Sequence, residues 1–150
     1  TLTVYYPLNL GTLVGVLHVP EKSEFSDFRG TPIPAGLYTL RYGQQPADGN
    51  HLGTSEVADF LLALPAKTDV DPKPISIVDQ LHKSSAKASG TTHPAIFLLL
   101  PPEEGAEAAA ALTHEENRDL WILSVTAAGK DKDKKVQVPF RLVTIGKAEG

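Results

Sequence analysis

Two histidines and one aspartate in turn-rich parts of the chain are the residues best suited to chemistry. His51 lies in the glycine-rich segment GNHLG, Asp59 begins an apolar run, and His93 stands shortly before another apolar run. Imidazole and carboxylate groups can together bind a divalent metal such as zinc and leave one coordination position open for water. The alternative is that each imidazole hydrogen-bonds a turn or faces solvent.

These three side chains meet only if the strands are arranged in one way. If the strands that start at Asp59 and at Ala95 are neighbours, the loops before them meet at one end of the fold. His51, Asp59 and His93 then form a binding site, or a metal site with zinc as the candidate ion. The chain is in that case a small metal-binding protein or a metal-dependent enzyme.

Other catalytic patterns in the chain are incomplete. Ser84 and Lys87 have the SxxK spacing of a serine nucleophile and its lysine base, but the SDN and KTG elements that accompany it in penicillin-binding enzymes are absent. His114 begins like a zinc-protease motif, yet Arg118 stands where the second histidine is needed. GxSxG, Walker-type and GxGxxG motifs are also absent. The sequence therefore favours a protein that is not an enzyme.

Composition indicates one ordinary folded domain over residues 1–150. The chain is 41% hydrophobic and 21% charged, which is enough apolar material for a core. Its formal net charge of −4 argues against a nucleic-acid partner, because phosphates are neutralised by an excess of Lys and Arg. The longest apolar run, residues 95–100, is far shorter than the roughly 20 residues that span a bilayer. We expect no transmembrane segment in this chain.

Strand patterns occupy much of the sequence. Residues alternate between two strand faces in 1–8, 37–42, 119–126 and 135–145, and residues 12–19 are rich in β-branched and aliphatic residues. Two short apolar runs also indicate strands: residues 59–64 suit a strand buried on both faces or a sandwich-core strand, and residues 95–100 suit a central strand. The last two alternating segments predict an antiparallel hairpin, and Pro139 places its second strand at a sheet edge.

Helical spacing is found in a shorter part of the chain. Residues 75–88 have apolar positions three and four apart and predict a helix that ends near Gly90. Residues 103–112 suit a second short helix, because carboxylates open the segment and alanines follow. Asp69 and Asp71 lack the rest of a calcium-binding loop and indicate a solvated turn. The predicted fold is mainly β, a single antiparallel β-sandwich of jelly-roll or immunoglobulin/transthyretin-like type with one or two short helices.

Aromatic residues offer a second kind of site. Their faces and polar tips can line a groove for a glycan or a peptide. The candidates are Tyr5, Tyr6, Tyr38, Tyr42 and Trp121. Tyr38 and Tyr42 share one strand face and are expected to pack inward, which favours a role in the core over a role in binding.

Residues 30–40, GTPIPAGLYTL, resemble a strand-entry motif of secreted bacterial β-sandwich domains, including transthyretin-like modules. The longer text through DGNHLG, DFLLALPA and SGTTHPA looks like an uncharacterised bacterial envelope family. The resemblance implies a periplasmic or extracellular protein whose signal sequence is removed or not included, and it supplies no catalytic residue. The resulting hypothesis is a non-enzymatic binding or structural module of the cell envelope, with a protein, peptide or glycan as partner.

Overall fold

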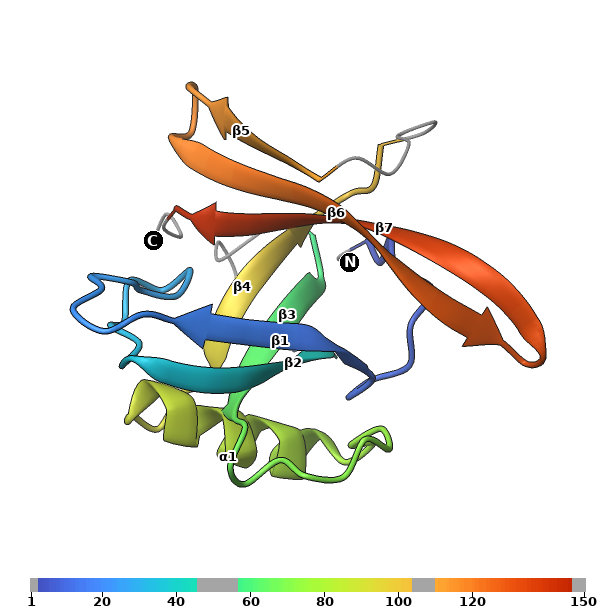
Figure 1. Ribbon diagram of the computed structural model, residues 1–150, viewed down its shortest axis with the longest axis horizontal. Coiled ribbons are helices and arrows are strands. Elements are labelled where there is room, and N and C mark those ends of the chain that lie inside the picture. The colour runs from blue at the N-terminus through green and yellow to red at the C-terminus, as the bar shows by residue number, and fades with distance from the viewer. Residues whose placement is uncertain (1–2, 46–56, 104–109, 147–150) are drawn as a thin grey trace.

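The computed structural model describes residues 3–45, 57–103 and 110–146. Within these residues, seven strands form one sheet in the order β1-β2-β3-β4-β7-β6-β5, and neighbouring strands are antiparallel (Figure 1). In chain order the elements are β1 (Leu13–Val19), β2 (Gly36–Gln44), β3 (Asp59–Pro65), α1 (Val78–Ser89), β4 (Ala95–Leu100), β5 (Ala111–Glu115), β6 (Leu120–Asp131) and β7 (Lys134–Ile145). The mainly β, antiparallel prediction is confirmed. A sandwich is not, because the described strands belong to a single sheet.

Apart from Asp59, the central strands β3 and β4 are apolar, because both faces of the sheet are covered there. Alternate residues point to opposite faces of a strand. One face, which we call the tyrosine face, carries Tyr6, Tyr38 and Tyr42 in one apolar cluster with alternate residues of β3 and β4. The other, which we call the helix face, packs Phe60 and Leu98 against Leu81 of α1. The prediction of two buried strands is confirmed.

Helix α1 lies along the helix face and packs on β3 and β4 (Figure 1). It ends where expected, since Gly90 adopts the left-handed conformation with φ 67° and donates its N–H to Ala86 O. Ser85 is fully buried against the sheet, where its hydroxyl donates to Ala63 O at 2.7 Å and accepts from Ala95 N at 3.0 Å. The helix begins at Val78, three residues later than the spacing predicted.

The first segment is not the strand that its alternation predicted. Thr3 makes one isolated parallel bridge with Val57, and residues 4–9 have no regular structure. Tyr6 instead stacks on Phe140 with 5.4 Å between ring centroids and donates its hydroxyl to Leu100 O at 2.6 Å. Pro7 cannot donate to a sheet ladder, so the segment covers the tyrosine face without joining the sheet.

Two further expectations concern the second half of the chain. The second helix was expected over residues 103–112; residues 104–109 lie outside the described part, and Ala111 and Leu112 belong to β5. The hairpin of β6 and β7 is confirmed.

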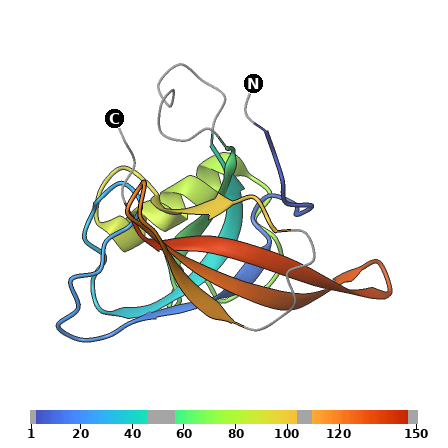
Figure 2. The ribbon, with the colours of Figure 1, turned by 90° about the horizontal axis from the view of Figure 1, so that it is seen from above.

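The placement of β7 at the sheet edge is wrong, because β7 lies between β4 and β6. Strand β4 pairs with β7 only at Leu142 and Arg141, so the part of β7 that carries Pro139 has β6 as its one neighbour among the described strands. This end of the hairpin extends from the body of the protein (Figures 1 and 2). Pro139 is tolerated here because no further strand has to bond to its nitrogen.

Candidate functional site

The three residues predicted to form a metal site are not gathered by the described structure. Strands β3 and β4 are neighbours, which is the condition that the site required, but they run antiparallel, with Ala63 paired to Ala95. Asp59 therefore lies at one end of the pair and His93 at the other, about 20 Å of extended chain away. His51 lies outside the described residues. Among the residues that are described, no group of three His, Asp or Glu side chains is placed to hold a metal ion.

Asp59 is fully buried and serves the core. Its carboxylate accepts the backbone N–H of Tyr5 at 2.8 Å and a short hydrogen bond from the Tyr42 hydroxyl. Burial, followed by the hydrogen bond to Asp59, raises the pKa of Tyr42. Burial also raises the pKa of Tyr6 to about 12. Both phenols thus stay neutral donors at any ordinary pH, and Asp59 joins the first segment to β2.

His93 is exposed at the opposite end of the sheet. Its backbone is bonded into a turn, since its N–H donates to Thr91 Oγ1 at 3.0 Å and its carbonyl accepts from Ser89 Oγ at 2.6 Å. The turn links the end of α1 to β4. His93 and Asp59 therefore have separate surroundings, and the part of the predicted site that includes His51 stays a prediction.

The strongest polar cluster in the described structure joins Arg41 of β2 to Asp69. Arg41 is fully buried, and its Nε and Nη2 donate to the two carboxylate oxygens of Asp69 at 2.7 and 2.8 Å. Its remaining donors bind the carbonyls of Gly11, Lys73 and Asp71 at 2.6–2.9 Å, so all five N–H groups are satisfied. We call this cluster the arginine clamp.

The arginine clamp corrects the prediction of a solvated turn at Asp69. Thr39 also donates its hydroxyl to Asp69 at 2.5 Å. Burial acts to raise the pKa of Asp69, but the hydrogen bonds from Arg41 and Thr39 together outweigh it and the pKa is lowered. The sequence signal that was missed is Arg41 itself, a charged residue in a strand whose neighbours are apolar or aromatic. A buried charge of that kind requires a buried partner.

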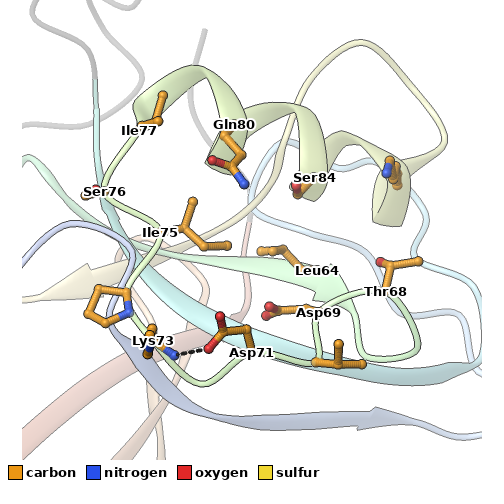
Figure 3. A pocket seen from close by; sticks show the side chains of 13 residues that line it. Leu64, Thr68, Asp69, Asp71, Lys73, Ile75, Ser76, Ile77, Gln80 and Ser84 are labelled. Carbon is orange, nitrogen blue, oxygen red and sulfur yellow. Dashed lines mark hydrogen bonds between the residues drawn. The ribbon is translucent and has the colours of Figure 1, made fainter.

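A pocket of about 300 Å³ lies between α1 and the loop that the arginine clamp holds (Figure 3). Leu64 and Ile75 supply apolar lining, and Gln80 and Ser84 point toward the loop from α1. Asp71 and Lys73 border it on the loop side, where Lys73 N donates to the Asp71 carboxylate at 3.0 Å. The volume is at the lower limit for ligand pockets.

The SxxK pair lines this pocket without forming a nucleophile and base. Ser84 is half-buried and Lys87 is exposed. A serine nucleophile needs its base within hydrogen-bond reach, and no hydrogen bond joins these two described side chains. The pocket can hold a small amphipathic group, but it contains no activated serine.

Tyr38 and Tyr42 pack inward, as their shared strand face predicted. Both are buried on the tyrosine face, and Tyr6 is buried with them. Trp121 stacks on His114, with 4.6 Å between ring centroids, and Tyr5 is exposed near the first bridge. The described structure therefore does not assemble these side chains into one binding groove.

The two ends of the sheet remain as candidate interaction sites. Strand β1 pairs only with β2 among the described strands, and no other described backbone group bonds to residues 13–19. The strand has the sequence LVGVLHV, which carries no Asp, Glu, Lys or Arg. Val16 points to the helix face opposite Thr39 and is 68% exposed, because α1 packs on β3 and β4 and leaves β1 uncovered.

Strand β5 forms the opposite end of the sheet and differs in its chemistry. Glu115 accepts two hydrogen bonds from Arg118 at 2.6 and 2.8 Å. His114 Nε2 lies 2.7 Å from the Asp119 carboxylate. The β5 edge therefore carries ionisable side chains beside the exposed Leu112, whereas β1 carries no Asp, Glu, Lys or Arg.

Comparisons with protein-family models, with curated proteins and with solved structures found no match for this chain. No helix in the described part of the chain has the length and apolar character needed to cross a membrane.

Proposed function

We propose that this protein is a non-enzymatic binding module of the bacterial cell envelope, and that it binds an extended segment of a partner polypeptide beside β1. The observation that carries the proposal is a mismatch between the position of β1 and its sequence. Strand β1 lies at the end of the sheet, yet it has the uncharged, apolar sequence of a strand with neighbours on both sides.

The interior strands show what such a sequence normally serves. Strands β3 and β4 are apolar on both faces, and both faces are covered. In β1, Val14 and Leu17 are only partly buried on the tyrosine face, and Leu13 and Val16 are exposed. An added strand would bond to the outward backbone groups of β1 and cover these side chains at the same time.

The bonding of three buried or partly buried carboxylates supports a binding role over a catalytic one. Asp59 is bonded to Tyr5 and Tyr42, and Asp69 is bonded to Arg41. Asp27 is buried and accepts three backbone N–H groups at 2.9–3.1 Å. Each of these carboxylates is committed to holding a loop or a strand in place.

The proposal is tested by selecting a phage-displayed heptapeptide library on the immobilised protein. We expect enrichment of sequences that alternate apolar and polar residues, and protection of β1 amides from hydrogen exchange when a selected peptide binds. Val16→Lys places a charge on the edge and should weaken binding of that peptide at least tenfold, since lysine is a natural block to strand addition.

The matched control is Leu112→Lys, the same kind of change at a 58% exposed position of β5. It should leave peptide affinity unchanged. Failure to select any peptide, or equal binding by both lysine variants, would overturn the proposal.

The envelope location is supported by the sequence resemblance of residues 30–40. It is tested separately, by fractionating the native host and locating the protein with an antibody. Recovery of the protein in the cytoplasmic fraction would contradict this part of the proposal and leave the binding mode untouched.

A further inference from the structure

Gly15 is a glycine inside β1 that the fold itself does not require. It pairs with Leu40 of β2 directly after the bulge at Val14. It is not among the glycines with positive φ, so its backbone conformation is open to other residues. Glycine weakens a strand interior, and a residue with a side chain would stabilise β1 here.

Close packing does not explain Gly15 either. A Cβ atom placed on it would meet no atom within 4 Å. Gly43 of β2 is the contrast, because a Cβ there would lie 2.2 Å from Leu62 Cδ1. Gly43 is needed to make room for a neighbour within the fold, whereas the space above Gly15 is empty of protein.

The empty space opens on the tyrosine face at the border of the core. Leu40, the partner of Gly15, is buried in that cluster, and Val14 and Leu17 pack against its border. All the side chains named are apolar, and none of the residues of β1 carries a formal charge. The open space over Gly15 therefore has room for a large apolar side chain that arrives from beyond the edge of the sheet.

We infer that the segment bound beside β1 carries an aromatic side chain opposite Gly15, which covers the glycine and packs on Val14 and Leu17. The inference rests on the strand-addition function proposed above. A flat aromatic ring lying over a cross-strand glycine restores the contacts that the missing side chain would make. The bound segment is thus an extended, uncharged stretch whose aromatic residue fixes its register on β1.

Gly15→Val tests this directly, because it places a side chain where the ring would lie while leaving the edge backbone free. The variant should fold, since its Cβ has room and its backbone needs no positive φ. Heptapeptides selected on the unmodified protein should share Phe, Tyr or Trp at one fixed position, and replacing that residue by Ala should weaken binding at least tenfold. Selection on Gly15→Val should favour a small residue at the same position.

The control is Gly129→Val on β6, where an added Cβ lies at an ordinary 3.7 Å from Val136 Cγ2. This variant should retain the aromatic preference of the unmodified protein. If peptides bind at β1 with no aromatic preference, or if Gly15→Val keeps that preference, the inference is overturned and strand addition stands. If no peptide is selected at all, the proposed function falls and the inference falls with it.

Discussion

The two edge strands of the described sheet, β1 and β5, differ in the side chains beside their unpaired backbone groups. Any edge strand exposes unpaired backbone groups that can template the addition of another strand. Strand β5 surrounds its edge with charge, through the Glu115 and Arg118 pair and the contact of His114 with Asp119. Strand β1 has no such charges and leaves Val16 in solvent.

Strand β1 thus combines an uncharged edge with firm support from the surrounding segments. The segments around β1 are tied down by the most extensive polar network described, the arginine clamp, which binds the carbonyl of Gly11 just before the strand. Strand β5 is flanked by exposed ion pairs that contribute little to stability. A firmly supported strand with an unprotected edge is suited to recognition, and a lightly supported strand with a protected edge is not.

The largest expected effect comes from breaking the support of β1. Asp69→Ala leaves the Arg41 charge buried without its partner and should lower the free energy of unfolding by about 3–5 kcal/mol. Glu115→Ala at the β5 edge should barely move the denaturation midpoint, because its ion pair with Arg118 is exposed. Urea denaturation of both variants measures the contrast.

A double variant separates lost charge pairing from lost packing. Arg41→Met combined with Asp69→Leu removes both charges and should be destabilised much less than Asp69→Ala alone. Equal losses in the two proteins would mean that the clamp stabilises by packing, and the contrast between the two edges would lose its electrostatic basis.

Acid should affect the two edges in the same direction and to different extents. The pKa of Asp69 is lowered in the fold, and hydrogen bonds from Arg118 lower the pKa of Glu115. A carboxylate with a lowered folded pKa stabilises above its unfolded pKa of about 3.9–4.3, and this contribution is lost as pH falls through the folded value.

We therefore expect the free energy of unfolding to fall as the pH decreases below the unfolded carboxyl pKa of about 4, because protons bind preferentially to the unfolded chain. Asp69→Asn should flatten that slope markedly, and Glu115→Gln should change it little. Denaturant titrations at several pH values measure both slopes. A larger change of slope in Glu115→Gln than in Asp69→Asn would contradict this expectation.

The smallest expected effect on stability comes from the exposed edge positions themselves. Val16→Lys and Leu112→Lys should each change the free energy of unfolding by no more than about 0.5 kcal/mol, because both side chains face solvent. Their effects on association should differ. At high protein concentration, light scattering should decrease in Val16→Lys and stay constant in Leu112→Lys, since β1, unlike β5, has no ion pair beside its described edge. Equal scattering by the two variants would remove the distinction.

Local patterns in the sequence predicted most of the strands. The uniformly apolar runs at residues 59–64 and 95–100 are explained by two covered faces, and Gly90 ends α1 because it can adopt positive φ. Those features depend on neighbouring residues in the chain. The number of sheets depends on long-range pairing, which a period of two residues does not encode.

The candidate metal site required β3 and β4 to run in the same direction as well as to lie side by side. Strands β3 and β4 are neighbours, as the site required, but an apolar run looks the same in a parallel and in an antiparallel pair. The antiparallel register sends Asp59 and His93 to opposite ends. The prediction of a solvated turn at Asp69 was wrong because its partner Arg41 is 28 residues away and no local pattern links them.

Gly11 is the place where the chain leading into β1 crosses the chain leading into α1. Its N–H donates to Tyr42 O, its carbonyl accepts from Ile75 N, and a methyl group added to it would fall 1.9 Å from Ile75 O. Two main chains thus touch with no side chain between them. A displacement of the segment before α1 therefore requires the chain that enters β1 to move with it, which links the wall of the pocket beside α1 to this end of the sheet.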